Sequence, residues 1–248
     1  MNKLIITFML MVSPMFAFSD DEPYTTYTGE TLQCNLQDGK DANDVLKMVK
    51  NDWYNLAYPV PYEGWVLTPT LFADNDGGYD LFWAGFTANN SDMGASLDWF
   101  NANATKVFGK WQKLVNCSSW SHWDIFEARR PANQLVEGET GYWAFHSCNF
   151  KDGKSVSDLR ENDTEWNKFL DGIGHDGGVW RWWAGGGSDT QNSTDYYVNI
   201  SFSTMKEYGE YRDARMNAMM SGSMPEQIAD CAAPRVYSAN NIKAITTN

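Results

Sequence analysis

The four cysteines of this chain are placed at a regular spacing. They are Cys34, Cys117, Cys148 and Cys231. The first and third are 114 residues apart, as are the second and fourth, and 83 residues separate the two members of each half. A spacing that repeats over a domain-sized distance predicts two tandem copies of one unit, each closed in the same way.

A second repeat follows the first cysteine of each half. Cys34–Lys40 is CNLQDGK and Cys148–Lys154 is CNFKDGK, with five of seven positions identical. Further on, DLFWAGF at Asp80–Phe86 parallels YYVNISF at Tyr196–Phe202, which places Phe86 in register with Phe202. These matches favour a duplication and argue against a solenoid of short repeats.

The N-terminus has the pattern of a secretory signal peptide. Lys3 precedes an apolar stretch from Leu4 to Phe16, and small residues follow before Asp20. The pattern predicts a signal peptide over residues 1–19 and a periplasmic or secreted protein. The alternative is an uncleaved membrane anchor, but the apolar run is shorter than the roughly 20 residues that a span needs.

An even number of cysteines behind a signal peptide predicts disulfides. Four cysteines allow three pairings, and repeat symmetry favours Cys34–Cys117 with Cys148–Cys231. Free cysteines would require a reducing compartment. A zinc site is not expected, because no CxxC pair is present and the three histidines are scattered.

The net charge of −13 constrains the partners of the chain. Nucleic acid and anionic membrane surfaces bind clustered Lys and Arg, so neither is expected as a partner. No segment after the signal peptide is apolar and long enough to cross a bilayer. A small-molecule ligand remains the expected partner, and the oligomeric state is not predicted.

Apolar periodicity and turn residues divide the chain into two units with the same order of elements. Residues 20–130 form repeat 1, 131–139 the linker and 140–248 repeat 2. In repeat 1 we expect strands at 30–37, 64–72, 79–88 and 122–128, and helices at 42–56 and 91–115. In repeat 2 we expect strands at 141–150, 179–184, 196–203 and 235–239, helices at 156–170 and 205–220, and a helical turn at 225–229.

The order β-α-β-β-α-β, present twice, is that of the ferredoxin-like split βαβ fold. In that fold the last strand lies antiparallel beside the first, which brings the proposed cysteine partners together. Helices cover one face of each sheet, so the two sheets can bury their other faces against each other. The predicted fold class is α+β, with two tandem ferredoxin-like units whose sheets pack into an intrachain α/β barrel.

In this order of elements and in its aromatic strands, the chain resembles the dimeric α/β-barrel superfamily as a fused tandem duplicate. That group includes antibiotic-biosynthesis-monooxygenase-like, stress-responsive and NIPSNAP-like domains. The resemblance covers nearly all of the chain after residue 19 and rests on no motif. It implies a ligand cavity between the two sheets, and no cofactor is expected because many such barrels work without one.

Alternation along the strands suggests which residues line that cavity. Matching Phe86 with Phe202 places these two side chains against the helices, so Trp83, Tyr197 and Asn199 are predicted to face the cavity. Asn35 and Asn149 are also predicted to face it, on the side opposite the cysteines. A repeated strand Asn suggests an amide that orients a ligand, although a structural role in the adjoining turn is favoured over it.

The aromatic strand at 179–184 contains the one arginine expected at the cavity. Arg181 and Trp183 share one face and Trp180 and Trp182 the other. We expect Arg181 and Trp183 to face the cavity or its mouth, where a guanidinium can hold an anionic group. The alternative is an arginine stacked on tryptophan at the rim.

Candidate catalytic residues are few. His122 and Asp124 alternate on the last strand of repeat 1 and could form an acid–base pair. The alternative is sequence drift on an exposed edge. His146 is expected in the core beside Cys148, and His175 in a solvated turn. The segment 74–78 (DNDGG) is interpreted as a turn, with weak Ca²⁺ binding as an alternative, and no metal site is expected.

Three functions are therefore compatible with the sequence. The first is a secreted or periplasmic protein that binds a small apolar or aromatic ligand between its sheets. The second is a cofactor-independent monooxygenase-like or isomerase-like enzyme that uses His122 with Asp124. The third is a structural or interaction protein whose two sheets seal against each other.

Overall fold

The computed structural model describes residues 24–73, 78–133, 135–188 and 194–243. The predicted signal peptide at 1–19 and most of the turn at 74–78 lie outside these ranges. The first half contains β1 (Thr25–Leu36), α1 (Ala42–Met48), a π-helical turn (Val49–Trp53), β2 (Glu63–Leu71), β3 (Leu81–Thr87), α2 (Asn90–Asn103), α3 (Thr105–Trp111) and β4 (Val115–Arg129). The second half contains β5 (Thr140–Phe150), a 3-10 turn (Val156–Asp158), α4 (Leu159–Gly172), β6 (Val179–Ala184), β7 (Tyr196–Phe202), α5 (Met205–Ser221), β8 (Ala229–Cys231) and β9 (Arg235–Lys243).

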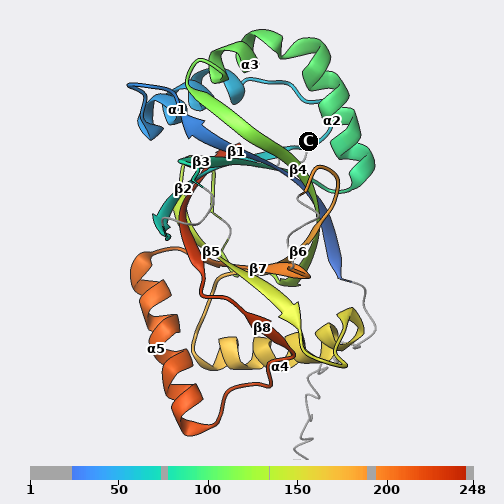
Figure 1. Cartoon of the computed structure of the whole chain (residues 1–248), viewed down its shortest axis with the longest axis vertical. Coiled ribbons are helices and arrows are strands. Elements are labelled where there is room, and N and C mark those ends of the chain that lie inside the picture. The colour runs from blue at the N-terminus through green and yellow to red at the C-terminus, as the bar shows by residue number, and fades with distance from the viewer. Residues whose placement is uncertain (1–23, 74–77, 134, 189–193, 244–248) are drawn as a thin grey trace, which may run out of the picture.

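Eight of the strands close into an antiparallel barrel. The first half pairs its strands in the order β4-β1-β3-β2, and the second in the order β9-β5-β7-β6. The two sheets join along both edges, through β4 with β6 and β2 with β9. Figure 1 shows the closed ring, with α1, α2 and α3 outside the first sheet and α4 and α5 outside the second. This arrangement confirms the predicted fold class.

The repeated sequence string has the same local structure in both halves. Gly39 and Gly153 have positive φ angles of 72° and 76°, which a glycine adopts without steric cost. Each turn leads into a capping box, completed by Asp44 in the first half and Asp158 in the second. The division of the chain into two repeats with a linker at 131–139 stays a prediction, and so does the common origin of the repeats. The structure does not test either one, because both halves contribute strands to one closed barrel.

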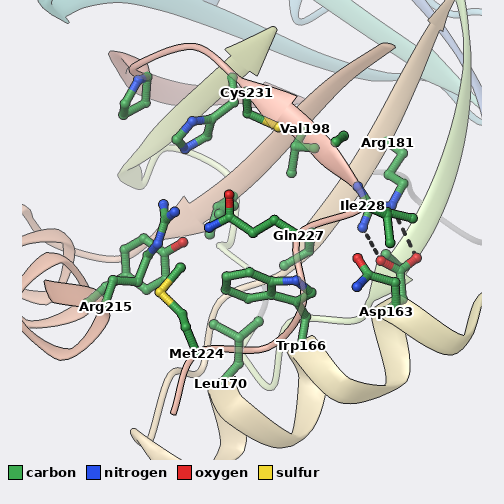
Figure 2. Close-up of a pocket in the computed structure, with 18 of the residues that line it drawn as sticks. Asp163, Trp166, Leu170, Arg181, Val198, Arg215, Met224, Gln227, Ile228 and Cys231 are labelled. Atoms are coloured by element: carbon green, nitrogen blue, oxygen red, sulfur yellow. Dashed lines mark hydrogen bonds and ion pairs between the residues drawn. The ribbon is translucent and has the colours of Figure 1, made fainter. Parts of the chain in front are cut away.

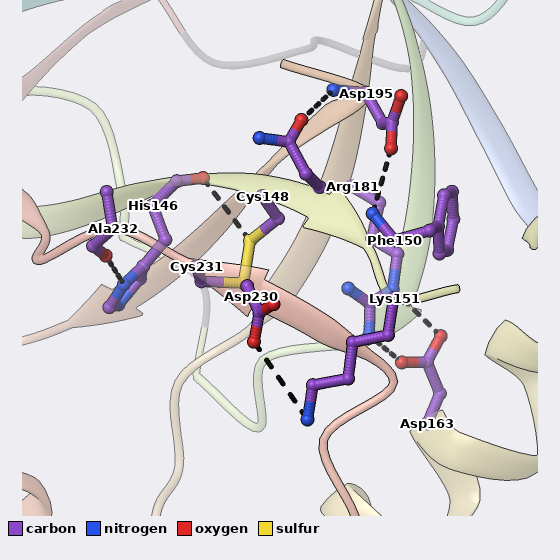
Figure 3. The surroundings of a disulfide bond; sticks show 11 residues. His146, Cys148, Phe150, Lys151, Asp163, Arg181, Asp195, Asp230, Cys231 and Ala232 are labelled. Atoms are coloured by element: carbon purple, nitrogen blue, oxygen red, sulfur yellow. Dashed lines mark hydrogen bonds and ion pairs between the residues drawn. A yellow bond between two sulfur atoms is a disulfide. The ribbon is translucent and has the colours of Figure 1, made fainter. Parts of the chain in front are cut away.

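Two disulfides join the first strand of each half to the region where its last strand begins. They are Cys34–Cys117 and Cys148–Cys231, each spanning 83 residues, and they are the expected pairs. In each pair the two cysteines are direct partners on neighbouring antiparallel strands. Figure 3 shows the second disulfide between β5 and the short strand β8. Two disulfides are typical of an oxidising, extracellular compartment.

Two predicted helical segments differ from the structure. The long helix at 91–115 is two helices, because α2 ends at Asn103 and α3 ends at Trp111, and β4 then begins at Val115. The helical turn expected at 225–229 is wrong; β8 begins at Ala229 and pairs with β5, which is what brings Cys231 to Cys148. Within the described ranges, no helix combines the length and hydropathy needed to cross a membrane.

Apolar side chains fill three regions. One cluster lies between the first sheet and its helices, where the ring centroids of Trp53 and Trp83 are 4.5 Å apart. A second lies between the other sheet and α4 with α5, and includes Leu170 and Tyr211. The third is inside the barrel, where Trp65 and Trp143 pack at 4.8 Å. The interior is thus packed with aromatic rings over part of its length.

Candidate functional site

A cavity of about 660 Å³ occupies part of the barrel interior and extends to Tyr208 and Arg212 of α5 and to residues 232–234. Polar side chains at its wall include Thr31 and Gln33 from β1 and Ser147 from β5. Its other lining is mainly aromatic and comes from both sheets: Tyr79, Phe82, Trp123, Phe145, Trp182, Tyr197 and Tyr237. A concave apolar wall with a few polar groups is the usual form of a small-molecule site.

Hydrogen bonds hold several of these rings in place. The hydroxyls of Tyr79 and Tyr237 are 2.5 Å apart, and the Trp123 indole N–H donates to the Thr31 hydroxyl at 2.8 Å. Burial, together with the neighbouring Tyr79, raises the pKa of Tyr237. The phenol therefore stays protonated at neutral pH, and the cavity wall here carries no negative charge.

Two buried donors in the barrel have no partner in the part of the chain that the structure describes. The Trp182 indole nitrogen and the Asn199 amide nitrogen are both buried and make no hydrogen bond within the described residues. An unpaired buried donor costs about 1–3 kcal/mol. Sites of function tolerate such costs more often than ordinary cores do. Both residues belong to the inner face of the second sheet, at or beside the cavity.

Some of the predicted ligand-binding residues line the cavity and others do not. Tyr197 lines the cavity. Asn199 is 1% exposed and lies beyond the cavity wall, between Phe145 and Trp180 on the neighbouring strands. Asn35 and Asn149 are exposed near the ends of their strands and do not line it. The Asn149 amide oxygen accepts from the Asp195 backbone N–H at 3.0 Å, a structural role.

The prediction that Trp83 faces the barrel is wrong. Trp83 is fully buried in the cluster under the helices of the first half, and its indole N–H donates to the Tyr62 hydroxyl at 3.0 Å. The strands pair Cys34 with Leu81 and Cys148 with Tyr196, so Leu81 corresponds to Tyr196. The predicted alignment of Phe86 with Phe202 is therefore wrong by one residue. A shift of one residue exchanges the two faces of a strand.

Arg181 and Trp183 also face the helices and not the barrel, which corrects a second prediction. Arg181 is 7% exposed and pairs with Asp163 of α4, with Nε to Oδ2 at 3.1 Å. Trp183 stacks on Tyr196 with ring centroids 5.5 Å apart. Trp180 and Trp182 of the same strand belong to the barrel cluster. Arg181 therefore belongs to a different cavity.

His122 and Asp124 lie outside the barrel. Trp123 and Ile125 of β4 belong to the interior cluster, so the side chains that alternate with them point outward. Asp124 is exposed, and its carboxylate accepts from the Asn90 amide at 3.0 Å. The proposed acid–base pair therefore does not reach the barrel cavity. Within the described ranges, no group of three His, Cys, Asp or Glu residues has the geometry to hold a metal ion.

A second cavity of about 370 Å³ lies between the second sheet and helices α4 and α5. Figure 2 shows Trp166 and Leu170 of α4, Arg181 of β6 and Arg215 of α5 around it. Sequence patterns did not predict this cavity. The sequence did contain a signal for the ion pair of this cavity. Asp163 lies four residues after Leu159 and three residues before Trp166, which places it on the apolar face of α4.

One buried and one half-buried carboxyl group were also missed. Glu30 is 3% exposed, accepts from the Tyr62 hydroxyl at 2.5 Å and from the Trp120 indole at 2.6 Å, and its pKa is raised by burial. The adjoining space is only about 10 Å³, so this network has room for about one water. Alternation along β1 was the sequence signal for the burial of Glu30, because Glu30 shares a face with Leu32 and the buried Cys34.

The second carboxyl, Glu63, makes stability depend on pH. Burial raises its pKa to about 7, and its Oε1 accepts from Trp65 Nε1 at 2.9 Å and Asn241 Nδ2 at 3.3 Å. The folded chain binds this proton more tightly than the unfolded chain, so stability falls as pH rises from about 4.5 to about 7.

Replacing Glu63 with Gln mimics the protonated form. Stability of the variant should match the original chain at pH 4 and exceed it by about 3 kcal/mol at pH 8, measured by urea unfolding. The exposed Glu210→Gln is the control and should change neither value. A difference between the Glu63 variant and the original chain that is equal at both pH values would contradict the prediction.

Comparison with known proteins relates the chain to others through its fold. No protein-family model and no curated protein matches it. Among solved structures, a candidate monooxygenase from Fusobacterium nucleatum is similar with a TM-score of 0.51 and 10% identity, over 88% of this chain and 95% of that one. A variant of chlorite dismutase from Candidatus Nitrospira defluvii is similar with a TM-score of 0.51 and 8% identity, over 88% and 92%.

This chain has the dimeric α/β-barrel fold. At such low identities the likeness extends to the fold alone, and it matches the resemblance drawn from the order of elements. The barrel of this chain is closed by two halves of one polypeptide.

Proposed function

We propose that this protein binds a small apolar or aromatic ligand inside the barrel. The observation that carries the proposal is the cavity of about 660 Å³, walled by aromatic rings from both sheets. A barrel that only sealed its two sheets against each other would have no reason to keep this volume, since packed cores contain few voids larger than a water molecule.

The chemistry of the wall indicates the class of ligand. Rings such as Phe82 and Phe145 offer apolar and edge-to-face contacts. Gln33 and Ser147 offer a few neutral hydrogen bonds, and Arg212 and Arg235 are the cationic residues at the wall. A flat, mostly apolar molecule with one or two polar atoms fits this set.

A cofactor-independent monooxygenase is the second candidate, supported by the name of the Fusobacterium structure. His122 and Asp124 do not serve it, because both side chains point away from the barrel. Of the residues at the wall that can transfer protons, Tyr79, Tyr197 and Tyr237 lie within the barrel. An oxygenase in this barrel would therefore rely on phenols and on the reactivity of its substrate.

Location is the other part of the proposal. The two disulfides indicate an oxidising compartment, and the N-terminal pattern favours export to the periplasm or the medium. Sequencing the N-terminus of the protein purified from its own source should find Asp20 first. A chain that keeps residues 1–19 would contradict export by signal cleavage.

Filling the cavity should weaken binding. Gln33→Trp places an indole at the wall, whereas Asn35→Trp places the same ring two residues further along β1, where the side chain is exposed. With the neutral dye N-phenyl-1-naphthylamine, Gln33→Trp should weaken binding by about tenfold or more, and Asn35→Trp by less than about twofold. Fluorescence titration measures both.

Two outcomes would contradict the barrel site. The first is that the original chain shows no saturable binding of the dye. The second is that Gln33→Trp binds as tightly as the original chain. An equal loss of dye affinity in both variants would instead indicate that Asn35 is a binding residue, as the repeated Asn in the sequence suggests.

A further inference from the structure

The cavity under α4 and α5 adjoins the barrel cavity, since Tyr208, Arg212 and residues 232–234 line both. It is bounded by the outer face of the second sheet and by the two helices, and its interior is lined by apolar side chains such as Trp166, Leu170 and Ile200. Figure 2 shows Met224, Gln227 and Ile228 closing another side. The volume of about 370 Å³ lies within the range of small-molecule sites.

Several charged side chains line this cavity. Three arginines and one aspartate line it, and Asp163 is paired with Arg181. Arg212 and Arg215 remain, and neither forms an ion pair with any residue that the structure describes. The cavity therefore has two uncompensated positive charges in a chain whose net charge is −13.

Aromatic rings hold both guanidinium groups at the wall. Arg215 lies over the rings of Trp166 and Tyr211, 5.7 and 5.8 Å from their centroids. Arg212 lies over Tyr208 at 5.9 Å and donates to its hydroxyl at 3.2 Å. Stacking fixes the plane of a guanidinium and leaves its other N–H groups able to bind an oxyanion.

His146 adds a neutral group to this wall. Burial and the two arginines lower its pKa to about 4, and its Nδ1 lies 2.9 Å from the Ala232 carbonyl oxygen. A carbonyl only accepts, so Nδ1 carries the proton and Nε2 is an acceptor. The histidine therefore adds no charge near neutral pH.

The rim of the cavity is rich in methionine. Met216 and Met219 of α5 line it and are 49% and 59% exposed, and Met224 follows on the next segment. Methionine side chains are flexible and adapt to ligands of different shape. Exposed apolar residues around a concave surface commonly mark a binding site.

We propose that this cavity is a second ligand site, specific for a hydrophobic carboxylate. The carboxylate lies at Arg212 and Arg215, and the hydrocarbon body lies along Trp166 and Leu170 towards the methionine rim. The two cavities meet at Arg212, whereas Arg215 and Trp166 line only this one. Arg215 gives this site its own preference for negative charge, whereas Arg235 lines only the barrel cavity.

Binding of decanoate, 1-decanol and decylammonium, each measured by equilibrium dialysis, tests the charge selectivity. Decanoate should bind about tenfold more tightly than decanol, and decylammonium more weakly than both. Arg215→Gln should bring decanoate to the level of decanol, whereas Arg215→Lys should retain part of the preference. Arg215 is half-buried on α5, so the fold of each variant is checked by its melting temperature.

Matched barrel variants separate this site from the first. Arg235→Gln removes an arginine that lines only the barrel cavity, and Gln33→Trp fills that cavity. Both should leave decanoate binding unchanged to within about twofold. Loss of decanoate binding in either would place the carboxylate in the barrel and overturn the proposal. Equal affinities for decanoate and decanol, or an unaffected Arg215→Gln, would overturn it as well.

Discussion

Asp163→Ala should lower the free energy of unfolding by about 3–5 kcal/mol. The carboxylate is 4% exposed and faces Arg181, which is 7% exposed, across two hydrogen bonds. It also accepts from the Tyr24 hydroxyl at 2.9 Å. Removing it leaves a guanidinium buried without a counter-ion, and the desolvation of that charge is no longer offset.

A second ion pair from the same helix provides the control. Glu165 lies two residues from Asp163, and its carboxylate meets Lys168 at 2.7 Å with both side chains exposed. Glu165→Ala should cost less than about 1 kcal/mol. Urea unfolding at constant m-value measures both variants. A loss below about 1 kcal/mol for Asp163→Ala would show that Arg181 finds other partners or water.

The double replacement Asp163→Leu with Arg181→Met separates pairing from burial. It removes both charges at once and keeps apolar volume at the site. Its stability should lie within about 1 kcal/mol of the original chain or above it. A double variant as unstable as Asp163→Ala would mean that packing around the pair, and not the unpaired charge, determines the loss.

The cysteine spacing carried most of what the sequence could predict about the fold. Cysteines can pair only where their Cα atoms come close, so two equal spacings limit the arrangement of each half. Together with the order of elements they led to strand order, barrel and pairing. The ends of elements were less accurate, because the break at Ala104 between α2 and α3 leaves no proline or glycine in the sequence.

The faces of β3 were predicted wrongly for a physical reason. Both faces of that strand are apolar, since Trp83 lies under the helices and Phe82 and Phe86 lie in the barrel. Hydrophobic alternation, which fixes the register of a half-exposed strand, is absent from a strand buried on both sides. The disulfide register was the better guide, because Cys34 and Cys148 fix Leu81 and Tyr196 as equivalent.

The same limit applies to β6, where rings occupy both faces. The sequence prediction placed Arg181 at the barrel cavity, because a charged side chain is less costly at a cavity than in an apolar core. Its counter-ion is Asp163, on the apolar stripe of α4, 18 residues earlier in the chain. A charged residue at a core position of one element suggests an opposite charge on the element packed against it. Neither residue alone carried that information.

Loss of the first disulfide should be the other large effect. The double variant Cys34→Ser with Cys117→Ser frees a loop that spans 83 residues. In the chain-entropy model this lowers the free energy of unfolding by roughly 4 kcal/mol. The second disulfide spans the same 83 residues, so Cys148→Ser with Cys231→Ser should cost a similar amount. Guanidinium unfolding of the oxidised proteins measures both.

Comparison of the two variants tests the entropic argument itself. Equal loops predict equal losses, to within about 1 kcal/mol, whatever the surroundings of the sulfur atoms. Those surroundings differ, because Cys117 accepts from the Trp111 indole at 3.3 Å inside the first core, whereas Cys231 is exposed at the edge of the second cavity. A much larger loss in the first half would therefore assign the stabilisation to packing around the sulfur and not to restriction of the unfolded chain.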